Sequence, residues 1–248
     1  MAKGAELDEG VEIGAYSIVG AHVKIARGVR VMPHVFLDGW TTIGEECVIF
    51  PFASIGTQTQ DLKYKGGVTF VEIGDHTTLR EYVTVNGGTN EGDLTRVGSR
   101  CHIMAYSHVA HQCVVGNGVI IANAGTLAGH VTVEDNAVIG GLCGIHQFVR
   151  VGRLSILGGC SKATQDIPPF MMADGNPASV RGLNTIGLQR HAVPETARQT
   201  LKEAYRMLFR ENLTTKAALD KMKAELPRCA ELEHLASFVA ASERGIAR

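Results

Sequence analysis

The sequence predicts a mainly β solenoid, a stack of short strands and corners, followed by a small helical domain. The main observation is a period of six: between Leu7 and Leu157, 23 of the 26 residues spaced six apart are Ile, Leu or Val. Six is neither the period of a strand, which is 2, nor that of a helix, which is 3.6. Each six-residue unit is therefore expected to form one short strand plus one corner.

A second position of the repeat supports the same architecture. The residue two before each aliphatic anchor is nearly always small or β-branched, and at four places it is a cysteine: Cys47, Cys101, Cys113 and Cys143. We expect both positions to point into a narrow core, so that these cysteines are structural and bind no metal. Glycine often follows the anchor, where we expect corner angles that a Cβ would strain.

The repeat lapses at two places. Near 57–72 and 86–96, turn residues and charges replace the anchors, in GTQTQDLKYKGG and NGGTNEGD. These segments are predicted to be loops that leave the solenoid. Loops ejected from an otherwise regular solenoid are usually functional, because a plain coil would serve stability alone.

The pattern changes after Leu157. Paired prolines and Gly175-Asn176-Pro177 predict an irregular connector, and a helical period of apolar residues begins near Leu183. Helices are expected behind Pro194, then over 214–226 and 230–243. We assign 1–182 to the solenoid and 183–248 to a C-terminal helical domain.

Composition limits the classes of function. The chain has 248 residues and a formal net charge of −1, which gives no basic field for nucleic acid. No apolar stretch is long enough to span a bilayer, and the N-terminal MAKGAELDEG has no signal-peptide hydrophobic region. The sequence therefore predicts a cytoplasmic protein without a transmembrane segment.

The period of six and its small inward residues resemble the hexapeptide-repeat acyltransferases. That resemblance implies a triangular, left-handed parallel β-helix with three six-residue units to a coil. The handedness comes from the resemblance alone, because parallel crossovers are otherwise nearly always right-handed. Roughly eight coils at ~4.8 Å each would make a prism nearly 40 Å long.

Histidines gather in the last coils of the predicted prism. With three repeat units to a coil, His111, the pair Gly129-His130 and Gln147 should share one edge. A single histidine at a corner is more often a polar surface residue than a catalytic one. A stack along one edge favours a site with acid–base chemistry.

Longer segments carry a more specific resemblance. They are HVAHQCVVGNGVIIANAGTLAGHVTVEDNAVIGG, HQFVRVGRLSILGGCSKATQDIPPF, GNPASVRGLN and the loop SIGTQTQDLKYKGG. Together they resemble the UDP-N-acetylglucosamine O-acyltransferases of lipid A biosynthesis, over nearly the whole chain. The resemblance implies transfer of a 3-hydroxyacyl chain from the phosphopantetheine thioester of acyl carrier protein to the sugar 3-position. It also implies a homotrimer with active sites between subunits, and no separate cofactor.

The same resemblance assigns the catalytic roles. His111 matches the general base, which a sugar hydroxyl needs because it is a poor nucleophile at neutral pH. Gly129 matches the backbone N–H donor to the oxyanion. Gln112 stands in the position of the residue that orients the base. Gly159 matches the acyl-chain ruler, where the missing side chain implies room for a long chain.

Other residues are expected to bind the substrates. Asp61 and Lys63 match loop residues near the sugar, and His130 helps to hold the substrate. The nucleotide side and the remaining lining are expected to include Gln147, Asn184, Arg190, His108 and His146. Without the resemblance, Asp61 and Lys63 would be read as solvated loop charges, and Arg190 as a cation at a helix C-terminus.

The chain departs from the usual family pattern at four positions. Gln112 stands where many relatives have aspartate, Asn86 where histidine is frequent, Ile186 where glutamate is frequent, and His191 where a second arginine is frequent. An amide carries no charge, so Gln112 suggests a weaker base. An amine needs less help from a base than a hydroxyl does, so the 3-amino analogue of UDP-N-acetylglucosamine is an alternative acceptor.

Three other classes of function stay open. Some left-handed β-helices bind zinc through three histidines and act as carbonic anhydrases, although the histidine spacing here differs. The N-acyltransferase that acts later in the same pathway usually carries an extra N-terminal uridine-binding domain, which this sequence lacks. A solenoid that serves only as a scaffold would explain the prism but not the stacked histidines.

Overall fold

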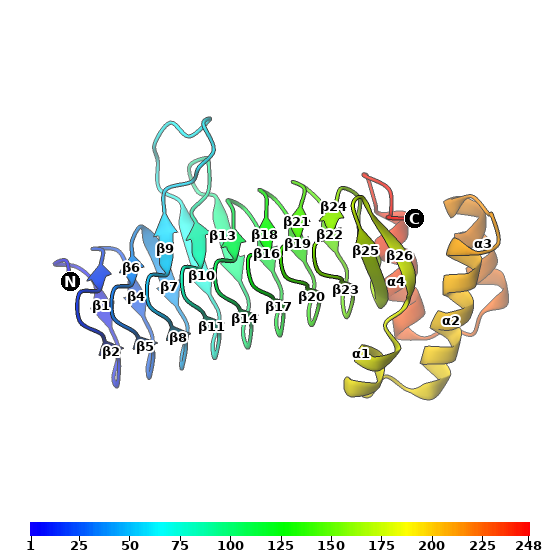
Figure 1. Ribbon diagram of the computed structural model, residues 1–248, viewed down its shortest axis with the longest axis horizontal. Helices are drawn as coiled ribbons and strands as arrows, with labels where there is room; N and C mark the ends of the chain where they lie inside the picture. The colour runs from blue at the N-terminus through cyan, green and yellow to red at the C-terminus, as the bar shows by residue number, and fades with distance from the viewer.

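The computed structural model describes residues 1–248 and shows a long prism with helices packed at one end (Figure 1). Three parallel sheets form the walls of the prism, and every third strand of the chain joins the same sheet. The first wall contains β1 (Glu6–Leu7), β4 (Lys24–Ile25), β7 (Trp40–Ile43), β10 (Phe70–Ile73), β13 (Leu94–Val97), β16 (Val114–Val115), β19 (Thr132–Val133) and β22 (Arg150–Val151). The second wall contains β2 (Glu12–Ile13), β5 (Arg30–Val31), β8 (Val48–Ile49), β11 (Thr78–Leu79), β14 (His102–Ile103), β17 (Ile120–Ile121), β20 (Val138–Ile139) and β23 (Ile156–Leu157). The third wall contains β3 (Ile18–Val19), β6 (Phe36–Leu37), β9 (Ser54–Thr57), β12 (Thr84–Asn86), β15 (His108–Val109), β18 (Thr126–Leu127), β21 (Gly144–Ile145) and β24 (Lys162–Ala163).

The coil of three repeat units that the resemblance implies is confirmed by the strand register. In the third wall, Val109 pairs with Leu127, and Leu127 pairs with Ile145. These anchors are buried, as are the small residues two positions before them, such as Cys113. The core is one continuous column from the first coils into the helices.

The four inward cysteines are buried, as predicted, and none of them forms a disulfide. Each thiol donates a hydrogen bond to a carbonyl of the next coil, for example Cys113 Sγ to Ala128 O at 3.0 Å. Burial raises the pKa of Cys113 to about 12 and that of Cys47 to about 11. A thiol needs to ionise before it attacks or binds a metal, so these groups act as small core residues.

The glycines that follow the anchors have a different role from the one predicted. Except at Gly56, their φ angles are not positive, so the corner does not need glycine for its backbone angles. A Cβ on Gly98 would instead lie 2.5 Å from the carbonyl oxygen of Gly116 in the next coil. These glycines are required because the coils approach each other too closely for a side chain.

The strained corner residue is the one three positions after the anchor. Gln112 has a φ of 52° and His130 has a φ of 61°, and both carry side chains. Non-glycine residues seldom adopt this left-handed region. In return, the amide N–H of His130 reaches the carbonyl of His111 at 3.0 Å, which ties one corner to the corner of the preceding coil.

Two edges of the prism carry distinctive corners. The histidine edge consists of the corner pairs His111-Gln112, Gly129-His130 and Gln147-Phe148. The aromatic edge consists of five rings stacked coil upon coil, with centroids 4.8 to 5.2 Å apart: Tyr16, His34, Phe52, Tyr82 and Tyr106. Gly159-Cys160 lies further along the aromatic edge, since Cys160 N donates to Gly141 O one coil earlier.

The two loops leave the prism side by side, above β9 and β13 (Figure 1). The first connects β9 to β10 over 58–69, and the second connects β12 to β13 over 87–93. They are bound to each other, with Val68 N donating to Glu91 Oε2 at 2.9 Å and Gly92 N to Val68 O at 2.8 Å. One folded unit therefore projects from the edge between the third and first walls, which is also the histidine edge.

The connector after Leu157 is more regular than predicted. After β24, the strands β25 (Met171–Gly175) and β26 (Ala178–Leu183) form an antiparallel hairpin that extends the second wall. Only turn signals are visible in the sequence here, because Gly175-Asn176-Pro177 forms the turn and the strands on either side are short. Inward and outward residues alternate along both strands.

Four helices complete the chain. They are α1 (Thr185–Arg190), α2 (Glu195–Phe209), α3 (Thr215–Glu225) and α4 (Ala230–Ala240), and the last ends earlier than predicted. The terminal segment returns to the prism, where Ala247 N donates to Asp166 O at 2.9 Å. None of these helices has the length and apolar character needed to cross a membrane.

Candidate active site

The histidine edge brings together the residues that the sequence placed one coil apart. The imidazole rings of His111 and His130 meet edge to face at 5.3 Å, and His130 stacks on Phe148 at 4.6 Å. The side chain of His111 is only 16% exposed. The corner is therefore a packed aromatic column, in which the ring of His111 has a fixed position.

One ring nitrogen of His111 is already occupied. Its Nδ1 is hydrogen-bonded to Gln112 Oε1, and Gln112 Nε2 in turn donates to a carboxylate oxygen of Asp93. Asp93 lies at the end of the second loop, and nothing in the sequence analysis identified it. The other ring nitrogen, Nε2, faces the first loop and is free to exchange a proton.

Gly129 lies directly against His111. A Cβ at position 129 would overlap three atoms of the His111 ring, so only glycine leaves room for the ring in its observed position. The amide N–H of Gly129 has no hydrogen-bond acceptor within the chain. A free N–H donor thus lies beside a histidine with a free ring nitrogen.

Asp61 approaches the same ring from the first loop. Its Oδ2 is 4.0 Å from His111 Nε2, and it also accepts a hydrogen bond from Thr89 Oγ1 at 3.2 Å. The backbone N–H of Lys63 donates to Oδ1 and is the main reason that the pKa of Asp61 is lowered. Asp61 therefore holds a negative charge at the free side of the imidazole.

Two further histidines of the site favour the neutral state. Burial, and then the neighbouring His111, lower the pKa of both His108 and His130. His108 lies on β15 and its Nδ1 is 2.7 Å from Thr84 Oγ1. Neutral imidazoles next to His111 avoid repulsion if that ring becomes a cation.

Other predicted residues surround this centre at greater distance. Lys63 is exposed on the loop, and His146 and Gln147 are exposed one coil beyond Gly129. The terminal segment reaches His146, whose Nδ1 is 3.3 Å from a guanidinium nitrogen of Arg244.

Three predicted residues lie away from His111. Gly159 is on the aromatic edge, a different corner of the prism. Asn184 is buried, with Nδ2 donating to Leu154 O at 2.8 Å and Oδ1 accepting from Gly187 N at 3.0 Å, so both ends of its amide support the start of α1. Arg190 is exposed in the last turn of α1.

Asn86 has an unusual environment. It is buried at the end of β12, where its Nδ2 donates to Thr57 Oγ1 at 2.9 Å while its Oδ1 has no partner. A buried acceptor without a donor is costly. Both Asn86 and Thr57 lie where the two loops leave the wall.

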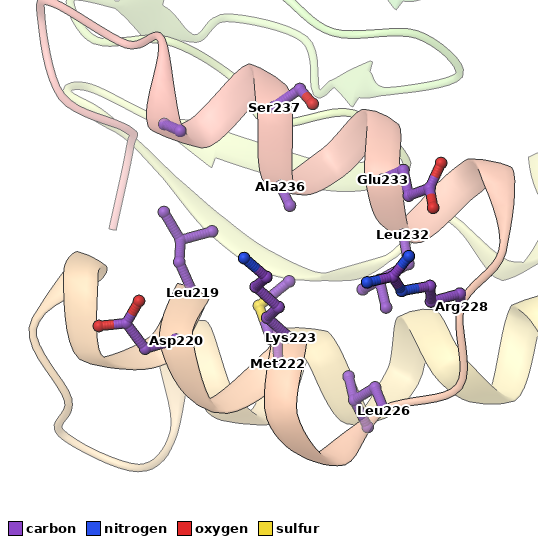
Figure 2. Close-up of a pocket in the computed structure, with 11 residues that line it drawn as sticks. Leu219, Asp220, Met222, Lys223, Leu226, Arg228, Leu232, Glu233, Ala236 and Ser237 are labelled. Carbon is purple, nitrogen blue, oxygen red and sulfur yellow. The ribbon is translucent and has the colours of Figure 1, made fainter.

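A cavity of about 520 Å³ opens between α3 and α4, where Leu219, Met222 and Leu226 face Leu232 and Ala236 (Figure 2). No histidine lines it. Within one chain, no group of three or more His, Cys, Asp or Glu side chains has a geometry that could hold a metal ion.

Family models match two parts of the chain. Residues 94–129 match the bacterial transferase hexapeptide, a model of six repeats, and residues 166–247 match domain 2 of UDP-N-acetylglucosamine O-acyltransferase. The first match covers the coils that contain His111 and Gly129. The second covers the hairpin and helices.

Known proteins match over nearly the full length. The chain is 51% identical over 245 residues to acyl-[acyl-carrier-protein]–UDP-N-acetylglucosamine O-acyltransferase of Thermodesulfovibrio yellowstonii, covering 98% of this chain and 95% of that one. The solved acyltransferase structure from Acinetobacter baumannii is 40% identical with a TM-score of 0.96, and that from Bacteroides fragilis is 37% identical with a TM-score of 0.98. Each covers 100% of this chain and 97% of the other.

These matches agree with the fold and with the resemblance found in the sequence. The predicted architecture, a left-handed parallel β-helix with a C-terminal helical part, is confirmed. The chain belongs to the family of acyl-[acyl-carrier-protein]–UDP-N-acetylglucosamine O-acyltransferases.

Proposed function

We propose that the protein transfers a 3-hydroxyacyl chain from acyl carrier protein to the 3-hydroxyl of UDP-N-acetylglucosamine, with His111 as general base. One observation carries the proposal: the ring of His111 lies against Gly129, whose amide N–H is free. A base and an oxyanion donor therefore lie side by side. Acyl transfer from a thioester to a hydroxyl requires both.

The reaction follows from these two groups. His111 Nε2 accepts the proton of the sugar 3-hydroxyl as its oxygen attacks the thioester carbonyl. The carbonyl oxygen gains negative charge, which the Gly129 N–H stabilises. The tetrahedral intermediate collapses to the ester, the C–S bond breaks, and the imidazolium returns its proton to the thiolate of the phosphopantetheine.

The loop residues are proposed to position the sugar. Asp61 lies 4.0 Å from His111 Nε2, so a hydroxyl placed between them can donate to either. The neutral rings of His108 and His130 complete this wall, while contacts from Lys63, His146, Gln147, Asn184 and Arg190 to the substrates stay predictions.

The proposal includes a trimer with its sites between subunits. Within one chain, His111 and Gly159 lie on different edges of the prism, so a groove that passes both needs two subunits. The exposed aromatic edge, with Tyr16 at 82% and Tyr106 at 62% exposure, is a surface that a neighbouring prism would cover. A cytoplasmic location is also part of the proposal. The acyl chain is attached to a carrier protein and the sugar to a charged nucleotide, and neither of these crosses a membrane.

The 3-amino acceptor remains the alternative. Its basis in the sequence is that Gln112 leaves His111 without a charged partner. In the structure the carboxylate of Asp93 contacts the amide of Gln112, which weakens that reasoning. We therefore favour the hydroxyl acceptor.

A competition assay tests the function and the acceptor together. Purified protein is given one 3-hydroxyacyl carrier protein and equal concentrations of UDP-N-acetylglucosamine and its 3-amino analogue. We expect mostly ester, identified by its lability to mild base. Mostly amide would favour the alternative acceptor, and the absence of both products would refute the acyltransferase proposal.

Replacing His111 tests the base. His111→Ala should keep UDP-sugar binding, measured by calorimetry, and the oligomeric state, measured by light scattering. Its kcat should fall by on the order of 10²-fold or more, as loss of a general base does. Turnover close to that of the unchanged protein would contradict the assignment.

Gly129→Ala tests the contact between base and oxyanion donor. The added methyl group displaces the His111 ring, so we expect kcat to fall by on the order of 10-fold to 10²-fold. Gly182→Ala is the matched control, because a Cβ there meets no atom within 4 Å. Equal activities of the two variants would show that the ring position does not matter.

Gly159 is proposed to limit the acyl chain. A Cβ there would lie 3.4 Å from Gly141 O, an ordinary contact, so the fold tolerates a side chain. Gly159→Met should shift the preference among 3-hydroxyacyl donors to shorter chains, and Gly159→Ala should shift it less. An unchanged chain-length profile in both variants would place the ruler elsewhere.

A further inference from the structure

We propose that Asp93 is a positioning residue that acts on His111 through the side-chain amide of Gln112. The inference rests on the proposed role of His111 as base. In this arrangement a carboxylate from the second loop fixes which nitrogen of the imidazole carries the proton. The amide of Gln112 connects the two groups and takes the place of a carboxylate in direct contact with the ring.

The chemistry of the three groups determines the direction of each hydrogen bond. The carboxylate of Asp93 can only accept, so the NH₂ group of Gln112 must face it. The carbonyl oxygen of Gln112 then faces His111. A carbonyl oxygen can only accept, so His111 Nδ1 must carry a hydrogen, and Nε2 is left with its lone pair toward the substrate side.

The negative charge of Asp93 affects His111 indirectly, through the amide of Gln112. An amide whose N–H donates to a carboxylate is polarised, and its carbonyl oxygen becomes a better acceptor. That oxygen stabilises the imidazolium that forms when His111 accepts a proton. Without Asp93, the amide of Gln112 has no reason to prefer this orientation, and its NH₂ group can turn toward Nδ1, which places the ring hydrogen on Nε2.

The backbone around Asp93 is arranged to present its side chain. In the regular corners, the second residue of the corner pair donates its N–H to a carbonyl of the preceding coil. The same pattern at Gln112 would use the carbonyl of Asp93. Instead, Phe70 N donates to the carbonyl oxygen of Asp93 at 2.8 Å, and Gln112 N donates to Thr95 Oγ1 at 2.9 Å. Asn90 N also donates to Asp93 Oδ2 at 2.7 Å, which holds the carboxylate in place.

A double-mutant cycle tests the role of Asp93. Asp93→Asn should lower kcat by about 10-fold or more, since an amide at 93 no longer dictates the orientation of Gln112. In the Gln112→Asp background, where a carboxylate contacts the ring directly, Asp93→Asn should change kcat by less than about 3-fold. An equal loss in both backgrounds would show that Asp93 only supports the loops, and would overturn the proposal.

The hydrogen on His111 provides a readout that does not depend on activity. With ¹⁵N-labelled histidine, NMR of the enzyme without substrates should show Nδ1 protonated and Nε2 unprotonated in the neutral ring. Asp93→Asn should increase the share of the opposite tautomer. The same tautomer in both proteins would refute the relay, whereas failure of the competition assay would refute only the acyltransferase proposal.

A control separates the relay from the turn that holds Asp93. Asn90→Ala removes a side-chain donor to Asp93, at 3.1 Å, but leaves the carboxylate and its contact with Gln112. We expect kcat within about 3-fold of the unchanged protein and an unchanged tautomer. A loss as large as that of Asp93→Asn would assign the effect to the turn and overturn the proposal.

Discussion

The close stacking of one coil on the next is the constraint on which the rest of the structure depends. Parallel pairing in all three walls repeats once per coil, and the corners are tied by hydrogen bonds such as His130 N to His111 O. Because this register leaves little freedom, residues one coil apart in the regular part of the prism must lie directly above one another. The candidate active site uses that rule: His111, Gly129 and Gln147 each come from a different coil.

Stacking also determines which residues can stand at the corners. Where two backbones approach most closely, as at Gly98 and Gly116, any side chain would collide with the next coil. Three residues past the anchor the backbone is left-handed, and side chains there project outward from the edge. Gln112 and His130 occupy this position. A rigid corner of this kind costs conformational strain but holds polar groups in fixed directions.

The sequence was sufficient for the repeat, its core residues and the two loops, because each follows from a period that side-chain size makes visible. The histidine edge also required the coil of three repeat units, which came from the resemblance to the hexapeptide-repeat acyltransferases. Other features were not accessible. The hairpin of β25 and β26 is too short to show a period, and the support that the amide of Asn184 gives to the start of α1 has no sequence signal. The role of Gly129 as space for the His111 ring depends on a rotamer, which no sequence pattern contains.

Asp93 was not predicted from the sequence, although it lies one full coil before His111. The spacing of one coil between Asp93 and His111 could not be recognised in the sequence, because the anchors lapse in the second loop. The register of the wall resumes only at β13. Its place at the base of the loop has a physical consequence. The loops contribute Asp61 on one side of the imidazole and Asp93, through Gln112, on the other. Because the loops are bound to each other, any movement of one loop changes the surroundings of both ring nitrogens, so the position of the loop proposed to bind the sugar and the state of the proposed base are physically linked.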